Sequence, residues 1–223
     1  MKISPRAFIF DLNGTMINDM EFHIRAWTYI LNEELKAGMT YDQVKSQMYG
    51  KNSELFIRVF GEGNMTKDEM EYWSMEKEKR YQQDYRPHLQ LIDGLDEFLK
   101  RAHEAKIPMG IGSAAIPFNI DFVLDQLDIR KYFSAIVSAE DVEISKPHPE
   151  TFLKAARLLN TSPADCLVFE DAPKGVEAAG NAGIPCVVLT TLHSRNEFPV
   201  TDHVVAFIID YNDPFIRNLI PNA

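Results

Sequence analysis

The order of apolar and polar positions predicts a chain that alternates between short buried strands and amphipathic helices. Apolar runs too short for helices recur through the second half of the sequence, and stretches with helical spacing separate them. The predicted strands cover residues 8–10, 107–113, 135–138, 166–169, 185–190 and 204–208, and the predicted helices cover 119–127, 149–159 and 175–182. Continuous apolar strands separated by helices are typical of a parallel sheet covered on both faces.

The segment from residue 16 to residue 88 interrupts this alternation. It contains no convincing strand and predicts helices over 21–36, 41–49, 53–60 and 67–85, separated by glycine-containing turns. Because the first strand belongs with the later ones, these helices form an insertion after it. We therefore expect an α/β fold. Residues 1–15 and 89–223 form a Rossmann-like parallel sheet flanked by helices, and residues 16–88 form an inserted α-helical cap domain.

Composition and charge narrow the class of function. The 223 residues carry a net charge of −10, which argues against a broad basic face for nucleic acid phosphates. The two cysteines, Cys166 and Cys186, form no CxxC pair and lie in or beside apolar runs, which indicates reduced, buried thiols. No signal-peptide pattern or membrane-spanning run occurs. We expect a cytoplasmic protein, a monomer or weak homo-oligomer, with neither nucleic acid nor membrane as a partner.

Polar side chains follow several of the predicted strands. Asp11 and Ser113 end two strands, Lys146 lies in the loop after a third, and Glu170 and Asp171 end a fourth. In a parallel sheet these ends converge at one edge. The carboxylates could hold Mg²⁺, which prefers oxygen ligands, while Lys146 and Ser113 could hold phosphoryl oxygens. Asp11 could then act as a nucleophile and form an aspartyl-phosphate.

Each of these residues, taken alone, also has a structural explanation. Asp11 could be only a turn former, and Ser113 could cap the following helix. Glu170 and Asp171 could likewise cap the next helix, and Lys146 before a proline could be solvated. Their combination in this order favours a site for phosphoryl transfer.

Four motifs together identify a family. They are Asp11-Leu12-Asn13-Gly14-Thr15, Gly110-Ile111-Gly112-Ser113-Ala114, Ser145-Lys146-Pro147-His148-Pro149, and the stretch from Val168 through Glu170-Asp171 to Ala179. With them, the sequence resembles the haloacid dehalogenase superfamily of phosphotransferases, and within it the beta-phosphoglucomutase-like group. The resemblance covers nearly the whole chain, and the third and fourth motifs are its most specific part.

The resemblance implies a role for each core residue. Asp11 is the nucleophile and a Mg²⁺ ligand, and Asp171 is the second carboxylate ligand, with Glu170 assisting directly or through water. The backbone carbonyl of Asn13 is the remaining protein ligand. Ser113 and Lys146 would hold the transferred phosphoryl group, and Ala114, beside Ser113 in the second motif, is expected to contact the substrate.

The inserted helices carry a second part of the resemblance. Residues 21–27 resemble E-Y-H-x-R-A-W, in which the histidine, here His23, couples cap closure to the acid/base region. Lys51 follows Gly50 in the expected substrate-specificity loop and is a candidate phosphate contact. Lys77 with Tyr81 matches a Lys-x-x-x-Tyr spacing. The alternatives are a structural buried histidine for His23 and, for Lys77, a solvated face within the charged run 76–80.

Asn13 departs from the family pattern. The family has an aspartate there as general acid/base, and an amide cannot transfer the proton, which costs roughly 10²–10⁴-fold in rate. Asn18 likewise stands where the family often has Asp. Asn13 could be native to an enzyme that is slow or uses good leaving groups, it could have been introduced to trap a complex, or the chain could bind a phosphorylated ligand without turnover. Asn13-Gly14 is also a deamidation sequence, which could generate aspartate.

These observations predict a Mg²⁺-dependent phosphohydrolase that acts on a small phosphorylated metabolite, such as a sugar phosphate, through an aspartyl-phosphate on Asp11. A phosphoglucomutase-type phosphotransferase is an alternative that depends more heavily on the missing acid/base. A non-catalytic phosphate-binding protein is another. A dinucleotide-binding oxidoreductase is disfavoured, because residues 110–115 fit G-x-G-x-x-A only in the second βα unit.

Overall fold

The computed structural model describes residues 4–199 and 202–220. The chain divides into two compact units, of which the smaller is Asp19–Leu89 and the larger combines the residues before Asp19 with those after Leu89. The sequence pattern placed the corresponding boundaries at residues 16 and 88. The insertion therefore leaves and re-enters the larger unit close to the end of the first strand.

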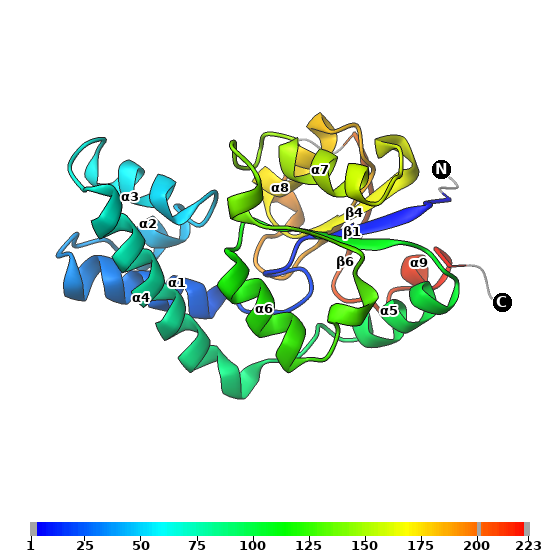
Figure 1. Cartoon of the computed structure of the whole chain (residues 1–223), viewed down its shortest axis with the longest axis horizontal. Coiled ribbons are helices and arrows are strands. Elements are labelled where there is room, and N and C mark those ends of the chain that lie inside the picture. The colour runs from blue at the N-terminus through cyan, green and yellow to red at the C-terminus, as the bar shows by residue number, and fades with distance from the viewer. Residues whose placement is uncertain (1–3, 200–201, 221–223) are drawn as a thin grey trace. The chain divides into compact units, whose positions relative to one another are not determined.

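The larger unit is built on the predicted parallel sheet (Figure 1). Its strands are β1 (Ala7–Phe10), β2 (Met109–Gly112), β3 (Ala135–Val137), β4 (Cys166–Glu170), β5 (Cys186–Leu189) and β6 (Val204–Ile208). They lie in the order β3-β2-β1-β4-β5-β6, and every neighbouring pair is parallel. The chain moves outward from β1 to β3 and then returns to β4, so the connections diverge between β1 and β4. Ligands of such sheets bind at this point, beyond the carboxyl ends of the strands.

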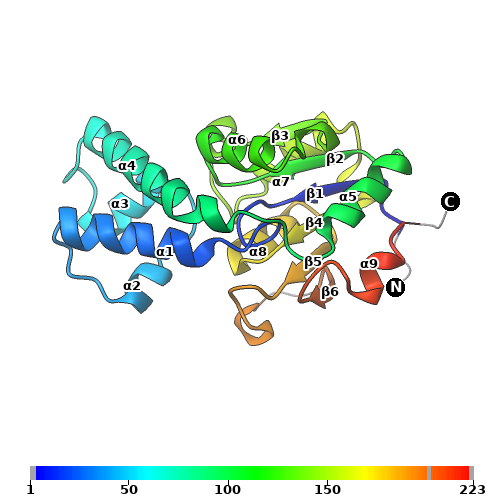
Figure 2. The same cartoon turned by 90° about the horizontal axis from the view of Figure 1, so that it is seen from below.

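Helices cover both faces of this sheet, as the pattern predicted (Figures 1 and 2). Helices α7 (Glu150–Leu158) and α8 (Pro173–Asn181) lie on one face, and α5 (Leu95–Glu104), α6 (Pro117–Gln126) and α9 (Pro214–Arg217) lie on the other. Short 3₁₀ turns occupy Arg130–Tyr132, Ala139–Asp141, Pro163–Asp165 and Arg195–Glu197.

Two helices were missed and two were predicted to begin too late. Helix α5 buries Leu95, Phe98, Leu99 and Ala102, a clear helical spacing that the sequence analysis did not use, whereas α9 is too short to show one. Helices α6 and α8 begin two residues before the predicted positions. Both begin at a proline, which fits the first turn because that position needs no backbone N–H donor.

The two faces of the sheet pack differently. The rings of Phe8 and Phe10 from β1 gather with Phe98, Phe169 and Tyr211, and Phe10 and Phe169 stack with 4.8 Å between ring centroids. The alternate residues of β1, Ala7 and Ile9, face an aliphatic cluster with α7 and α8. Since side chains alternate across a strand, β1 is buried on both sides and its carboxyl end is held firmly.

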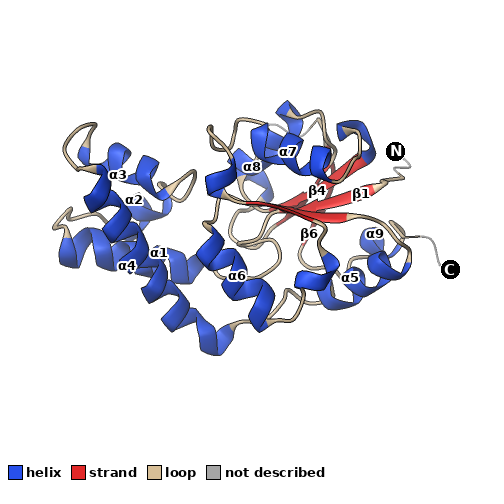
Figure 3. Cartoon of the chain, in the orientation of Figure 1, coloured by secondary structure: helices blue, strands red, loops and turns tan. Residues whose placement is uncertain are grey.

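The smaller unit is helical, as Figure 3 shows. It contains α1 (Met20–Tyr29), which continues as a π-helical turn at Ile30–Glu34, then α2 (Tyr41–Lys45), α3 (Asn52–Phe60) and α4 (Lys67–Tyr85), followed by a 3₁₀ turn at Arg86–His88. The predicted bounds of α4 are correct because Thr66 and Glu69 form a capping box at its start. The α-helices predicted over 21–36 and 41–49 are too long: the first loses α-helical geometry after Tyr29, and the second ends at Lys45.

The structure also bears on the cysteines and on membranes. Cys166 and Cys186 are both free thiols and both buried, as predicted, and burial raises the pKa of the Cys186 thiol well above its usual value. Among the described residues, no helix combines the length and the apolar character that a membrane span requires.

The aromatic cluster generates a test of what holds the larger unit together. Phe169 is fully buried between Phe10 and Phe98, so Phe169→Ala should lower the free energy of unfolding by about 3–5 kcal/mol. Phe118→Ala removes a ring that is 40% exposed and serves as the matched control. Urea denaturation followed by circular dichroism measures both, because both tryptophans, Trp27 and Trp73, lie in the smaller unit. Equal losses in the two variants would contradict the assignment of this cluster as the main core of the sheet.

Candidate active site

A buried lysine joins the ends of β1 and β4. The Nζ atom of Lys146 donates to Asp11 Oδ1 at 2.7 Å and to Glu170 Oε1 at 2.8 Å. All three side chains are at most 10% exposed. Burial by itself would lower the pKa of Lys146, but the Asp11 and Glu170 carboxylates outweigh this effect and raise it above the ordinary value. The solvated alternative for Lys146 is therefore wrong, and its ammonium group remains charged at neutral pH.

Glu170 is fixed through both of its carboxylate oxygens. While Oε1 accepts from Lys146, Oε2 accepts from the backbone N–H groups of Asp171 and Ala172, each at 2.7 Å. Helix α8 passes so close that a Cβ at Gly175 would lie 1.6 Å from Glu170 Oε1. The N-cap of α8 is Ala172, so neither Glu170 nor Asp171 occupies the N-cap position considered from the sequence. Glu170 thus orients Lys146 and the turn that carries Asp171.

Asp171 lies directly against the turn that follows Asp11. Thr15 Oγ1 donates to Asp171 Oδ1 at 3.3 Å. Gly14 has φ of +75°, and a Cβ on it would lie 2.0 Å from Asp171 Oδ2. Only glycine allows the backbone both this conformation and this approach. The fold thereby brings the two aspartates of the first and fourth motifs to neighbouring strand ends.

The donor set suits a divalent cation. Asp11, Glu170 and Asp171 are buried carboxylates, and with Lys146 their formal charge is −2. Buried charge of one sign is costly unless it is balanced, and a hard divalent cation would balance it. Across residues 4–199 and 202–220, no group of three or more His, Cys, Asp or Glu side chains is arranged to hold a metal ion. Asp11 and Asp171 nevertheless bring two carboxylates to neighbouring strand ends, and carboxylate oxygen is a donor type that a hard divalent cation accepts.

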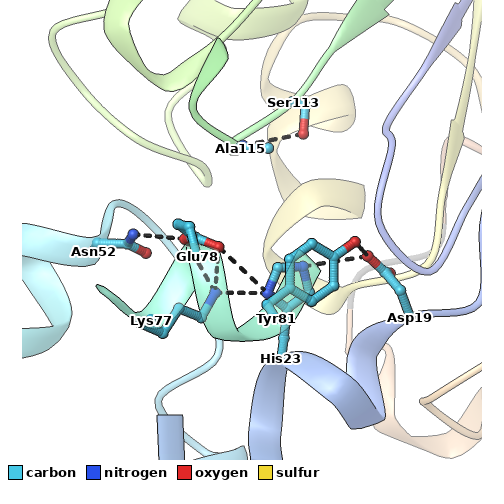
Figure 4. Close-up of polar contacts among 8 residues, drawn as sticks. All are labelled: Asp19, His23, Asn52, Lys77, Glu78, Tyr81, Ser113 and Ala115. Carbon is cyan, nitrogen blue, oxygen red and sulfur yellow. Dashed lines mark hydrogen bonds and ion pairs between the residues drawn. The ribbon is translucent and has the colours of Figure 1, made fainter. Parts of the chain in front are cut away.

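Ser113 and its neighbour reach the same edge of the sheet. Phe10 pairs with Ile111, so Ser113, just after β2, lies one residue beyond the level of Asp11. Its side chain is buried, and Oγ accepts from the N–H of Ala115 at 3.1 Å, as Figure 4 shows. Ile116 is the N-cap of α6, so Ser113 is not a helix cap. Ala114 and Asn13 are both half-buried at this edge.

In the smaller unit, His23 and Lys77 belong to one buried polar cluster (Figure 4). Lys77 Nζ lies 2.6 Å from His23 Nδ1 and donates to Glu78 Oε2 at 2.9 Å. Asn52 Nδ2 donates to Glu78 Oε1 at 2.7 Å. Lys77 is only 2% exposed, so the solvated face suggested for it is wrong. Lys51 lies outside this cluster, at the N-cap of α3 next to Asn52, and is half-buried.

The contacts of His23 define its tautomer. A lysine ammonium can only donate, so Nδ1 accepts, and in the neutral ring Nε2 carries the hydrogen. Nε2 lies 3.2 Å from Asp19 Oδ2, which also accepts from the Tyr81 hydroxyl. The imidazole stacks on the Tyr81 ring with 3.7 Å between centroids. Burial lowers the pKa of Lys77, and Glu78 opposes this effect. The imidazole is thus clamped between Asp19, Lys77 and Tyr81.

Sequence reasoning missed several partners in both units. Asp19 and Glu78 hold the His23 cluster, and Thr191 and Tyr211 contact the turn after Asp11. The i,i+4 spacing of Asp19 and His23 is a signal that could have been used. The contacts of Thr191 and Tyr211 span more than 170 residues and leave no local pattern.

Comparison with known proteins agrees with this geometry. The chain is 30% identical to the fructose-1-phosphate phosphatase YqaB of Escherichia coli over 185 residues, which is 81% of this chain and 94% of that protein. It is 31% identical to the beta-phosphoglucomutase of Bacillus subtilis over 199 residues, 80% of each chain. The crystal structure of a beta-phosphoglucomutase from Clostridium difficile superposes with a TM-score of 0.82 at 24% identity, covering 97% of both chains.

The family itself is established by the match along the chain. A model of haloacid dehalogenase-like hydrolases matches residues 8–189, which include all four motifs and the inserted helices. The two relatives cover most of their own length, so the similarity extends beyond the motifs. The resemblance predicted from the sequence is confirmed, and the protein belongs to the haloacid dehalogenase-like hydrolase family.

Proposed function

We propose that this hydrolase is a Mg²⁺-dependent phosphatase that acts on a small phosphorylated metabolite of the sugar phosphate class in the cytoplasm. The observation that carries the proposal is the Lys146 ammonium shared by Asp11 and Glu170 at the point where the strand connections diverge. It keeps a charged donor beside a carboxylate nucleophile in a buried setting. Phosphoryl transfer depends mainly on such positioning and charge stabilisation.

In the proposed reaction, a carboxylate oxygen of Asp11 attacks phosphorus. The bond from phosphorus to the substrate oxygen breaks as the aspartyl-phosphate forms, and water later cleaves that acyl phosphate. Lys146, which stays protonated, and the Ser113 hydroxyl would donate to the oxygens of the transferred group. Asn13 cannot give a proton to the departing alkoxide or take one from the attacking water, so both steps are slow in this chain.

The proposed Mg²⁺ ligands are Asp11, Asp171 and the backbone carbonyl of Asn13. Bound Mg²⁺ would neutralise phosphate charge next to the carboxylates. Glu170 has both oxygens engaged by Lys146 and by backbone N–H groups, so we propose that it supports the metal site by orienting its neighbours.

For the smaller unit, we propose that Lys51 contacts substrate and that His23 acts with Lys77. The ammonium group of Lys77 is already engaged by Glu78, which suits orienting His23 better than binding a second phosphate. This favours phosphatase activity over the mutase alternative. Of the two relatives compared, one is named for hydrolysis of fructose-1-phosphate and the other is a mutase.

Restoring the carboxyl at position 13 should restore turnover. Asn13→Asp should raise hydrolysis of sugar phosphates by roughly 10²–10⁴-fold, and less for aryl phosphates, whose leaving groups need little protonation. The measurement is phosphate release with Mg²⁺ across a panel of both substrate classes. Asn18→Asp is the matched control, because Asn18 is exposed and should give no gain. No gain with Asn13→Asp on any substrate would refute the role assigned to this position.

A second experiment separates a slow phosphatase from a protein that only binds phosphate. In a single turnover with an aryl phosphate, the wild-type protein should accumulate a phosphoryl adduct on Asp11, because Asn13 cannot activate water against it. Intact-protein and peptide mass spectrometry at low pH detects the adduct. Asp11→Asn should abolish it, and Asp96→Asn, an exposed helix residue, should not. Phosphate binding without any adduct would favour the non-catalytic alternative.

Metal binding can be measured without turnover. Mg²⁺ that binds the folded state should raise the melting temperature in proportion to the logarithm of its concentration above the dissociation constant. Asp171→Asn should remove most of this shift, and Asp125→Asn, on the outer surface of α6, should preserve it. An equal Mg²⁺ shift in both variants would rule out Asp171 as a ligand.

A further inference from the structure

Two side chains from distant parts of the larger unit hold the turn that follows Asp11. Thr191 Oγ1 donates to the carbonyl of Gly14 at 2.7 Å, and the Tyr211 hydroxyl donates to the carbonyl of Thr15 at 3.1 Å. We infer that Thr191 and Tyr211 are positioning residues that clamp this turn against Asp171 and thereby protect the Asn13–Gly14 peptide from deamidation. The catalytic value of the clamp rests on the proposed function, but its effect on Asn13 does not.

Thr191 has a task distinct from that of the threonine beside it. Both residues follow β5, but the hydroxyl of Thr190 donates to the carbonyl of Ile208 at 3.2 Å and so ties β5 to β6. The hydroxyl of Thr191 instead crosses to the turn after β1. This pair separates two effects of losing a threonine hydroxyl: loss of a link within the sheet and loss of a link to the turn.

Tyr211 is held firmly enough to act as a fixed donor. Its ring is 2% exposed and packs against Phe10, Phe98 and Phe169, and its backbone N–H donates to Asp93. Burial, together with the Asp11 and Asp171 carboxylates, raises the pKa of its hydroxyl well above the usual value. The hydroxyl therefore keeps its proton at neutral pH and can donate to the carbonyl of Thr15.

The turn needs such a clamp because it has little room. A Cβ at Gly14 would collide with Asp171, and the Gly14 N–H donates to the Ile17 carbonyl at 2.8 Å. With Gly14 held at its N–H and its carbonyl, and Thr15 held at its carbonyl, the peptide planes on both sides of Gly14 are fixed. A rotation of these planes would move the Asn13 carbonyl and release the Gly14 nitrogen.

Deamidation requires the freedom that the clamp removes. The Gly14 nitrogen gives up its proton and attacks Cγ of Asn13, the Cγ–Nδ2 bond breaks, and ammonia leaves with formation of a succinimide. Water then opens the ring to aspartate or isoaspartate. The hydrogen bonds of the Gly14 N–H to Ile17 and of the flanking carbonyls to Thr191 and Tyr211 oppose the backbone rotation that this attack needs. An Asn-Gly sequence that is labile in a flexible chain is thus held as the amide.

The test follows Asn13 itself, in metal-free protein without substrate. Samples of wild type, Thr191→Val, Thr191→Ser, Tyr211→Phe and Thr190→Val are incubated at mildly alkaline pH, and peptide mass spectrometry measures the modified fraction of Asn13 over time. Thr191→Val and Tyr211→Phe should deamidate about threefold to tenfold faster than wild type, the effect expected for loss of one hydrogen bond. Thr190→Val and Thr191→Ser should match wild type. Circular dichroism confirms that each sample is folded.

The outcomes are distinct. Equal rates in Thr191→Val and Thr190→Val, or unchanged rates in both Thr191→Val and Tyr211→Phe, would overturn the clamp. If Thr191→Val does not fold, Tyr211→Phe alone decides between the outcomes. A protein with no phosphatase activity could still show the predicted deamidation rates. Failure of the proposed function can therefore be distinguished from failure of the clamp.

Discussion

The ammonium group of Lys146 is the interaction on which the rest of the site depends. It lies between two carboxylates that end neighbouring strands, and those strands are adjacent only because the chain returns from β3 to the middle of the sheet. A carboxylate pair buried without a cation would carry a large desolvation cost. The parallel topology therefore requires a cation here, and the loop after β3 supplies it. Lys146 therefore balances the buried carboxylates, and the same ammonium group is the proposed donor to the phosphoryl oxygens.

Several residues around this lysine are constrained by the same charges. One carboxylate oxygen of Glu170 accepts from Lys146, and the other accepts from backbone N–H groups. Helix α8 passes so close to this carboxylate that only glycine fits at position 175. Gly14 likewise lies so close to the Asp171 carboxylate that a side chain at position 14 would collide with it. The two glycines mark the places where backbone approaches a carboxylate. Their role in the motifs is thus geometric, whereas the roles of the acids are electrostatic.

How far the sequence predicts this structure depends on the range of each interaction. The strands and α4 follow from local spacing and a capping box, and the convergence of Asp11, Lys146 and Asp171 follows from the parallel order of the sheet. The partners of Lys77 cannot be predicted in this way, because its neighbours on the chain are charged and suggest a solvated face. Only the packing of α1 and α3 against α4 reveals that His23 and Asn52 lie beside Lys77 and Glu78. Helix α5, by contrast, could have been predicted, because the helical spacing of its apolar residues is present in the sequence.

The charges of the site indicate what an aspartate in place of Asn13 would do. Lys146 and the three carboxylates of Asp11, Glu170 and Asp171 together carry a formal charge of −2. Like charges disfavour a further ionised group, so a carboxyl two residues after Asp11 is expected to have a raised pKa and to stay protonated, as a general acid requires. The Asn13 amide is equally neutral but has no such proton to give. The expected difference between the two residues is therefore in proton transfer and not in the charge of the site. In the proposed reaction, Asp11, Ser113 and Lys146 would still bind and accept the phosphoryl group, whereas both proton transfers assigned to position 13 would be slow. Affinity and turnover therefore need not change together in the proposed site.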